Sequence, residues 1–497
     1  MAVTTHDTRG RGNGAAAKPA VPFEPIVGAH LEHVMEKQST QWLFAPFDAA
    51  AVWATNWVDY WTRAMKRRAT PLDVASDVVR FWSTVTARPN PKWVTEHRVA
   101  AQWPVARLLD FSDGTGGIPT LLLPPQAGHA STIVDYSPQQ SQVRFALRSL
   151  EQVYVLEWLG ATEETKNTRI EDYIAIMDEA VAALGGRVNL VGDCQGGWLA
   201  TIYAALRPQA VTTLTIGAAP IDFQAGNASI HDWVERFGMM PDPMAVYKAL
   251  VKGGHGVHRG ENQITGFKMM EPAGEAERFA DLWGNIGNES YVERYLDFVA
   301  WFETPQAMPG AFYLWTVEHL FVNNELIQGT LEVGGEKVDL GRITVPLYLL
   351  AGTRDHITPP EQVWALAEYA GTPREHVHGR FFEAGHLGLF MGSRPLVEHW
   401  APIFADIAGE NERLLNREAQ ARAAETEART APVVTEAAPV VTEAAPAKKS
   451  TPVKKVTAKK AAPAKTAAPV KAAPPAKTTP PKTAPEAGEG GADTLTP

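Results

Sequence analysis

Residues 187–201 read Arg187-Val-Asn-Leu-Val-Gly-Asp-Cys-Gln-Gly-Gly-Trp-Leu-Ala-Thr, an apolar run that passes into a helical segment. A strand, a tight turn carrying a nucleophile flanked by glycines, and a helix make up a nucleophile elbow, here with Cys194 in place of the usual Ser. Gly192 and Gly196 are expected because backbone segments pass so closely at this turn that side chains do not fit. The stretch therefore predicts a covalent catalyst at the end of a sheet strand.

Cys194 is the single cysteine among 497 residues, which excludes an intrachain disulfide and a cysteine-based metal cluster. The elbow places its sulfur at a helix N-terminus, where the positive end of the helix dipole is expected to lower the thiol pKa. The backbone N–H of Gln195 is expected to point into an oxyanion hole. The alternative interpretation, a small buried apolar cysteine, does not account for the glycines on both sides.

An elbow nucleophile needs an acid and a base, which follow it along the chain in that order. Asp355 lies in a loop after the apolar run Leu347-Tyr-Leu-Leu-Ala, and His386 follows Phe381-Phe-Glu-Ala-Gly. Because parallel strands end at one edge of a sheet, both side chains are predicted to reach Cys194. His386 is predicted to take the thiol proton, and Asp355 to orient the imidazole and stabilise the imidazolium.

Other side chains compete for these roles. Asp222 is the alternative acid and His356 the alternative base. The second oxyanion donor is expected in the loop after an early strand, at the backbone N–H of Gln126 or Ala127. No cofactor or metal site is predicted, because acids do not cluster near the remaining histidines. Those interpreted as loop or strand-surface residues are His129, His376 and His378.

Seven apolar runs, punctuated by Gly and Pro, predict the strands of the sheet. They are Val105–Phe111, Thr120–Leu123, Gln152–Glu157, Arg187–Val191, Val211–Ile216, Val345–Leu350 and Val377–Phe382. Helical stretches such as Ile170–Leu184 lie between several of them, as in a mostly parallel α/β sheet covered on both faces. Residues 223–340 interrupt this alternation with a long segment rich in Met and aromatic residues, which predicts a cap or lid.

Composition divides the rest of the chain. All 44 Phe, Trp and Tyr lie at or before Phe404, and a segment without them buries too little apolar surface to offset its chain entropy. The predicted division is a disordered leader at 1–21, a helical N-terminal region at 22–104, a core at 105–222 and 341–408, the cap at 223–340, a solvated helix at 409–430 and a disordered Ala/Pro/Lys tail at 431–497.

The charge is unevenly distributed. The whole chain has a formal net charge of −10, but residues 444–497 carry ten lysines against three acids, which leaves −17 for residues 1–443. A basic tail on an acidic body predicts a polyanion such as DNA as the partner of the tail. The chain has no apolar run of eighteen residues and no signal-peptide pattern, so a cytoplasmic protein is expected.

Trp53, Trp57 and Trp61 recur at helical spacing and predict one aromatic face on an N-terminal helix. This face is expected to pack on the rest of the protein or on a second subunit, as in a homodimer. The alternative is a surface that adsorbs to a hydrophobic phase.

Several of these motifs together resemble the polyhydroxyalkanoate (PHA) synthases. The resemblance covers roughly residues 105–400, and rests on Gly192-Asp-Cys-Gln-Gly-Gly, Asp355-His-Ile-Thr-Pro, Gly385-His386, Met308-Pro-Gly-Ala-Phe and Val338-Asp-Leu. It implies an α/β-hydrolase fold with a cap insertion. It also implies Cys194 as the covalent acyl nucleophile, His386 as the base, and Asp355 as the acid assisting a hydroxyl or the histidine.

The resemblance implies an acyltransferase that polymerises 3-hydroxyacyl-CoA, with the thioester as substrate and no separate cofactor. The expected partners are the acyl-CoA or the polyester and the surface of a storage granule. Two alternatives remain open. One is a hydrolase of the same fold, either a polyester depolymerase or a thioesterase. The other is a non-catalytic granule-associated protein whose tail binds nucleic acid.

Overall fold

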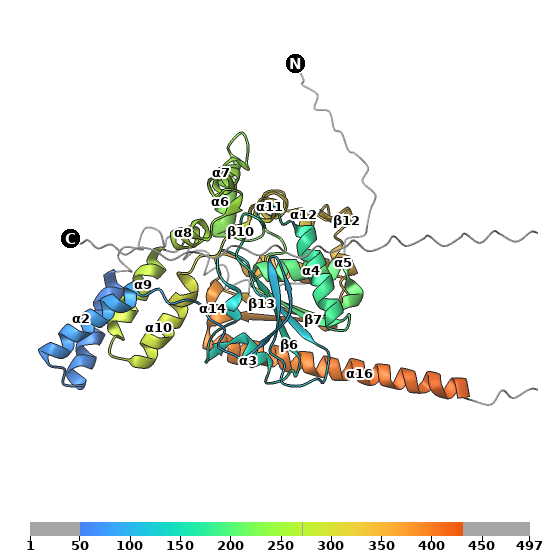
Figure 1. Cartoon of the computed structure of the whole chain (residues 1–497), viewed down its shortest axis with the longest axis horizontal. Coiled ribbons are helices and arrows are strands. Elements are labelled where there is room, and N and C mark those ends of the chain that lie inside the picture. Colours follow the sequence, from blue (N-terminus) through green and yellow to red (C-terminus); the bar gives the residue numbers. More distant parts are fainter. Residues whose placement is uncertain (1–49, 271, 431–497) are drawn as a thin grey trace, which may run out of the picture. The chain divides into compact units, whose positions relative to one another are not determined.

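The computed structural model of this chain describes residues 50–270 and 272–430, and an eight-stranded sheet forms its centre (Figure 1). The strand order is β1-β2-β6-β3-β7-β8-β13-β14. Pairs β1–β2 and β2–β6 are antiparallel, and every pair from β6 to β14 is parallel. This mostly parallel sheet, with an elbow after a central strand, confirms the predicted α/β-hydrolase fold.

Seven of these strands coincide within two residues with the predicted runs. The bounds are β1 (Arg98–Trp103), β2 (Ala106–Asp110), β3 (Thr120–Leu123), β6 (Val153–Trp158), β7 (Val188–Asp193), β8 (Val211–Gly217), β13 (Leu347–Gly352) and β14 (Val377–Phe382). Strand β1 was not predicted and lies inside the range 22–104 expected to be helical. Its residues are mostly exposed at the edge of the sheet, so it lacks the apolar pattern by which the other strands were predicted.

Helices cover both faces of the sheet. Alternate strand residues point to opposite faces, as in β13, where Leu349 packs with one core cluster and Leu350 with the other. One face carries α4 (Ile170–Ala183), α5 (Gln195–Leu206) and α13 (Pro360–Tyr369). The opposite face carries α3 (Gln142–Ala146), α14 (His386–Met391) and α16 (Ala401–Thr430).

The predicted cap is a mainly helical insertion between β8 and β13. Its helices are α6 (Ser229–Gly238), α7 (Ala245–Gly253), α8 (Gly260–Met270), α9 (Pro272–Gly284), α10 (Glu289–Phe302), α11 (Gly310–Trp315), a π-helical turn (Thr316–Val322) and α12 (Glu325–Gln328). Two short antiparallel pairs complete it, β9 (Val257–His258) with β10 (Met308–Pro309) and β11 (Glu332–Val333) with β12 (Glu336–Lys337).

Two N-terminal helices, residues 50–66 and α2 (Pro71–Thr86), pack on the cap. The Tyr60 ring lies 4.4 Å from that of Trp283, and Asn56 Nδ2 donates to Asp281 Oδ1 at 2.9 Å. The buried side of the first helix is the line Asn56, Tyr60 and Ala64. The predicted tryptophan face flanks this line, with Trp53, Trp57 and Trp61 37%, 52% and 39% exposed.

The last described helix differs from its predicted bounds. It begins at Ala401 instead of residue 409, because Ile403, Phe404 and Ile407 are buried in the core cluster that covers one sheet face. Beyond that anchored part, Arg187 still pairs with Glu418 at 2.5 Å. The leader 1–21 and the tail 431–497 lie outside the described residues, so the polyanion partner expected for the tail stays a prediction.

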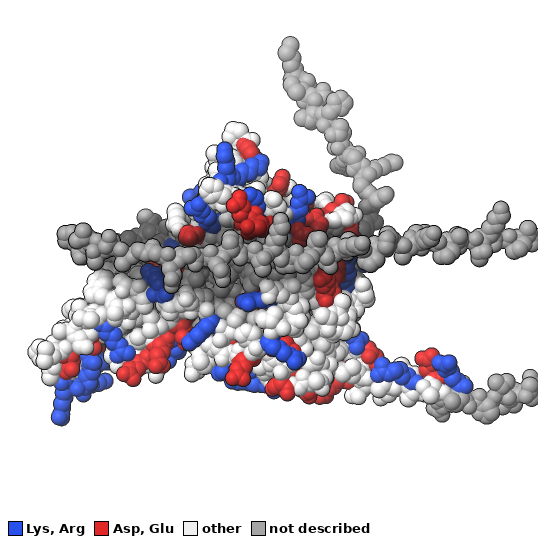
Figure 2. Space-filling view, in the orientation of Figure 1, with Lys and Arg blue, Asp and Glu red and all other residues white. Residues whose placement is uncertain are grey.

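The visible surface of the described part carries charges of both signs. Figure 2 shows Lys and Arg side chains interspersed with Asp and Glu over the cap and the core. None of the helices formed by residues 50–270 and 272–430 combines the length and the apolar character that crossing a lipid bilayer requires.

The two elbow glycines are required by close backbone contacts. A Cβ on Gly196 would overlap the carbonyl oxygen of Leu123 at the end of β3, and one on Gly192 would overlap the carbonyl of Gly196. We expect Gly196→Ala to lower the free energy of unfolding by about 3 kcal/mol or more, since backbone atoms cannot yield as a flexible side chain does. Urea denaturation followed by circular dichroism measures this change.

Gly253→Ala is the matched control for the elbow substitution. Gly253 ends α7, and a Cβ there would meet no heavy atom within 4 Å. Its free energy of unfolding should stay the same or rise by up to about 1 kcal/mol, as for an alanine replacing a helical glycine. Equal stability of the Gly196→Ala variant and the parent protein would contradict our account of the turn.

Candidate active site

Cys194 sits in the turn between β7 and α5 with a backbone φ of 49° and ψ of −116°. Few residues other than glycine adopt a positive φ, so the surrounding contacts must hold this conformation. The Cys194 N–H donates to the carbonyl of Gly217 on β8 at 2.8 Å, which ties the turn to the neighbouring strand. The turn thereby presents a partly exposed thiol at the C-terminal edge of the sheet, at the start of α5.

Asp355 and His386 meet at the same edge. His386 Nδ1 lies 2.8 Å from Asp355 Oδ2, and both residues are less than a tenth exposed. The other carboxylate oxygen of Asp355 accepts the backbone N–H groups of Ile357 and Thr358, each at 2.9 Å. These bonds hold the carboxylate in one orientation, which in turn orients the imidazole.

The loops that carry the acid and the histidine are bonded to each other. The Thr353 N–H donates to the carbonyl of Phe382 at 2.8 Å, and the Arg354 N–H donates to the carbonyl of Ala384 at 3.2 Å. Strands β13 and β14 pair in parallel directly below these bonds. The relative position of Asp355 and His386 is therefore set by the sheet itself.

The His386 imidazole interacts electrostatically with Cys194 as well as with Asp355. Burial alone lowers the pKa of this imidazole, but its interactions with Asp355 and Cys194 outweigh that effect and raise the pKa well above its ordinary value. The arrangement favours an imidazole that takes up a proton beside Cys194. The structure thus brings Cys194, Asp355 and His386 together.

The predicted oxyanion loop also lies at this site. Gln126 and Ala127 line the same cavity as Cys194 and Gln195. The Gln126 side chain is buried and turned into the protein, where its amide donates to the carbonyl of Leu159 at 3.1 Å and its carbonyl accepts from the Tyr173 hydroxyl. These bonds hold the loop and leave its backbone N–H groups as candidates for oxyanion donors.

A cavity of about 760 Å³, counted with its open mouth, lies between the elbow and the cap. The described residues of its wall are mostly apolar and aromatic, and they include one histidine but neither Lys nor Arg. The elbow and the acid loop contribute Cys194, Gln195, Trp198, Ile357 and Thr358, and the cap contributes Phe223, Ile230, His231, Phe267, Met308, Phe312, Tyr313, Val317 and Phe321.

The alternative residues have other partners. Asp222 Oδ1 accepts from Asn324 Nδ2 at 2.7 Å, a bond between the core and the cap. The backbone carbonyl of His356 accepts from Ser229 N–H at 2.8 Å and so ties the acid loop to the start of α6. Among the described residues, the acid bonded to the His386 imidazole is Asp355.

His129 lies in a loop, as predicted, but this loop is buried. His129 is 5% exposed, stacks 4.4 Å from the Trp301 ring and bonds to the carbonyl of Phe302 at 3.1 Å. Burial lowers its pKa to about 4. His376 is exposed, whereas His378 lies on β14 and stacks on Tyr348 at 4.9 Å. The cap that buries His129 could not be placed over it from the sequence.

One group of metal-binding side chain types occurs among the described residues. His231, Asp232 and Glu235 of α6 bring ligand atoms within 4.8 Å of one another, but both acids are exposed. His231 also belongs to the wall of the cavity that contains Cys194.

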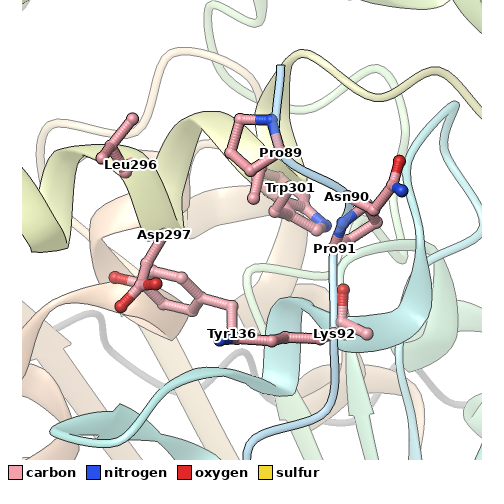
Figure 3. Close-up of a pocket in the computed structure, with 10 residues that line it drawn as sticks. Pro89, Asn90, Pro91, Lys92, Tyr136, Leu296, Asp297 and Trp301 are labelled. Carbon is pink, nitrogen blue, oxygen red and sulfur yellow. The ribbon is translucent and has the colours of Figure 1, made fainter. Parts of the chain in front are cut away.

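A second hollow, of about 430 Å³, lies between the chain leading into β1, the core and cap helix α10. Figure 3 shows Pro89, Pro91 and Lys92 from the incoming chain facing Asp297 and Trp301 from α10. None of its lining residues belongs to the cavity at Cys194. The catalytic candidates therefore gather at the cap cavity and not here.

Asp193, the residue before the nucleophile, was not predicted to have an unusual environment. Its carboxyl group is buried, and burial raises its pKa to about 8. Gln142 Nε2 donates to Asp193 Oδ1 at 3.4 Å, whereas the Gln142 carbonyl oxygen has no partner among the described residues. A protonated Asp193 can donate to that oxygen. The acidic residue in the middle of an apolar elbow was the available signal in the sequence.

We expect Asp193→Asn to stabilise the protein increasingly as the pH rises. The pKa of Asp193 is higher in the folded protein than in the unfolded chain, so the folded protein keeps a proton that the unfolded chain releases. The free energy of unfolding of the parent protein therefore falls as the pH rises from about 4 to about 8. Asparagine cannot ionise. From pH 5 to pH 8, the unfolding free energy of the variant relative to the parent should rise by about 1 kcal/mol per pH unit, measured by urea denaturation.

Asp110→Asn is the control for this titration. Burial raises the pKa of Asp110, but hydrogen bonds from Ser112 and Arg98 outweigh it and hold the pKa below its ordinary value. Asp110 is therefore ionised throughout this pH range in both states. Its variant should differ from the parent by a constant amount, and a similarly flat difference for Asp193→Asn would disprove the proposed protonation.

Among the proteins similar in sequence to this chain are three poly(3-hydroxyalkanoate) polymerases. The Haloferax mediterranei poly(3-hydroxyalkanoate) polymerase subunit PhaC is 27% identical over 59% of this chain and 59% of its own length. The Haloarcula marismortui subunit PhaC is 24% identical over 72% and 75%. The Ectopseudomonas oleovorans poly(3-hydroxyalkanoate) polymerase 1 is 30% identical over 54% and 47%. The chain thus spans about half to three quarters of these relatives.

A solved structure, that of a putative epoxide hydrolase mutant from Pseudomonas aeruginosa, covers 64% of this chain and 99% of its own with 15% identity and a TM-score of 0.39. A family model described as a protein of unknown function, DUF3141, matches residues 109–399. That match includes the elbow, the cap, Asp355 and His386. Because it spans more than half of the sequence, the chain belongs to the DUF3141 family.

Proposed function

We propose that this protein is an acyltransferase of the PHA-synthase type, which accepts the acyl group of a 3-hydroxyacyl-CoA thioester on Cys194. The observation that carries the proposal is the hydrogen-bonded pair of Asp355 and His386 next to Cys194 at an apolar cavity. The similarity to three PHA polymerases supports the choice of substrate class.

In the first step the Cys194 sulfur attacks the thioester carbon. As the sulfur attacks, His386 takes the thiol proton, and Asp355 stabilises the imidazolium that forms. The backbone N–H groups of Gln195 and of the Gln126 loop donate hydrogen bonds to the carbonyl oxygen as negative charge develops on it. When the carbon–sulfur bond to CoA breaks, His386 returns the proton to the leaving thiolate, and an acyl thioester remains on Cys194.

In the second step a hydroxyl group reacts with the acyl group that is bound to Cys194. Neutral His386 removes the hydroxyl proton as the oxygen attacks the acyl carbon, and the Cys194 thiolate leaves. A thioester to cysteine keeps the acyl group activated for this transfer, since exchange between thioesters is nearly isoenergetic. The new product is an oxygen ester that is one unit longer.

The cavity suits the acyl part of such a substrate. Aromatic and aliphatic side chains surround the thiol, and none of the described residues in the wall is a Lys or Arg that could pair with the phosphates of CoA. The acyl chain therefore enters the cavity while the nucleotide end stays outside it. Apolar walls also limit water near the acyl-enzyme, which favours transfer to a hydroxyl over hydrolysis.

The first test is incubation of the purified full chain with 3-hydroxybutyryl-CoA. We expect release of CoA together with formation of an oligomeric ester. Thiol titration measures the CoA, and mass spectrometry identifies the ester. Cys194→Ala should abolish both products and the acyl adduct in the intact mass, because no other cysteine is present. Release of free 3-hydroxybutyrate instead of ester would assign a hydrolase, and no adduct in the parent protein would refute both enzymes.

Cys194→Ser provides a further distinction between the two reactions. An oxygen ester on serine is a poorer acyl donor than a thioester, so ester formation should fall at least about 100-fold in this variant. A hydrolase acting through either nucleophile would keep releasing the free acid. The serine variant keeps the size of the side chain, so loss of activity would report on chemistry and not on packing.

The second test concerns the base and its orienting acid. We expect His386→Ala and Asp355→Asn each to lower kcat/KM by about 100-fold or more, since general-base catalysis contributes factors of this order. His356→Ala is the matched control. The orienting carboxylate of Asp355 bonds to the imidazole of His386, so His356 is not expected to act as the base. Near-normal activity of His386→Ala, together with an inactive His356→Ala variant, would reverse the assignment of the base.

A further inference from the structure

Most amide and hydroxyl side chains on the wall of the Cys194 cavity have hydrogen bonds within the protein. Their partners lie in the core or the cap, so these groups hold the wall in shape and are not free to bind a ligand. Gln126 bonds to Tyr173, and Gln263 bonds to His258. Thr316 bonds to the carbonyl of Phe312, and Gln362 bonds to the carbonyl of Phe223.

Gln195 differs from these residues. Its side-chain carbonyl oxygen Oε1 is buried and has no hydrogen-bond partner within residues 50–270 and 272–430. Leaving a buried acceptor unpaired is unfavourable, because the group has lost its hydrogen bonds to water without gaining others. A ligand that brings a donor to this oxygen would recover that free energy, so the oxygen favours ligands with an O–H or N–H group close to it.

Gln195 directly follows the nucleophile and starts the first turn of α5. Both residues line the same cavity. An acyl group bound to Cys194 therefore lies within reach of the Gln195 side chain, since consecutive Cα atoms are about 3.8 Å apart. In a 3-hydroxyacyl group, the hydroxyl oxygen lies three bonds from the thioester carbon, and hence within about 4 Å of it.

We propose that Gln195 recognises the 3-hydroxyl group of the acyl chain, with Oε1 accepting a hydrogen bond from that hydroxyl. This inference rests on the proposed acyl transfer to Cys194 and adds the residue that selects among acyl groups. An acyl chain of the same length without the 3-hydroxyl group has no donor at this position and leaves Oε1 unpaired. The site therefore discriminates against acyl thioesters that lack this hydroxyl group, because a ligand that leaves a buried polar group without a partner binds less well.

The experiment compares the acylation of Cys194 by 3-hydroxybutyryl-CoA and by butyryl-CoA. Each reaction is quenched at successive times, and kcat/KM for acylation is read from the intact mass of the full-length protein. We expect the parent protein to prefer the hydroxylated substrate by roughly 10- to 100-fold. In Gln195→Met, which has a similar size but no carbonyl, the preference should fall to less than about 3-fold.

Gln263→Met is the matched control, because Gln263 lines the same cavity but its carbonyl lies 3.2 Å from His258 Nε2. Its preference ratio should equal that of the parent. An unchanged ratio in Gln195→Met, or equal acylation by both thioesters in the parent, overturns the inference and leaves the acyl transfer in place. Acylation by neither thioester overturns both.

A second variant, Gln195→Glu, controls for the possibility that Gln195→Met misfolds. Gln195→Glu keeps an acceptor oxygen at the same distance along the side chain, so it should retain a preference for the hydroxylated substrate. Loss of the preference in this variant, with a cooperative unfolding transition like that of the parent, would also overturn the inference. The ratio of the two substrates separates recognition of the hydroxyl from any general effect on the thiol.

Discussion

The backbone turn at Cys194 is the constraint on which the active-site arrangement depends. A φ of 49° is unfavourable for cysteine, and it persists because α5 and the end of β3 meet the turn without intervening side chains at Gly192 and Gly196. The same contacts aim the thiol at the edge of the sheet and place the first N–H groups of α5 beside it. Loss of this turn would separate the nucleophile from its base and from the oxyanion donors together.

The sheet fixes the positions of Asp355 and His386, and the cap forms part of the cavity wall around Cys194. Asp355 and His386 follow two adjacent parallel strands whose loops are bonded to each other, so their geometry needs no contribution from the cap. The cap supplies the aromatic side of the cavity and is itself packed against the two N-terminal helices through Trp283 and Asp281. The cavity at Cys194 thus depends indirectly on residues that are far from Cys194 in the sequence.

Polar groups buried next to the nucleophile form a distinct feature of this site. Asp193 precedes Cys194 and is buried with a raised pKa, while Gln195 follows it with a side-chain carbonyl that has no partner among the described residues. Each group opposes folding, because desolvation is not fully offset by hydrogen bonds. A folded protein retains such costs mainly where the groups serve a ligand or a reaction, which is the basis for assigning a recognition role to Gln195.

Local sequence determined the strands, the elbow and the order of Cys194, Asp355 and His386, because each depends on short-range patterns: apolar runs for buried strands, glycines for the turn and loop positions after strands. Strand β1 was missed because an exposed edge strand has no apolar alternation. The burial of His129, the burial of Asp193 and the absence of a partner for the Gln195 oxygen among the described residues were decided by tertiary structure. Each arises where segments distant in the sequence exclude water from a polar group, and no local pattern specifies which segments meet.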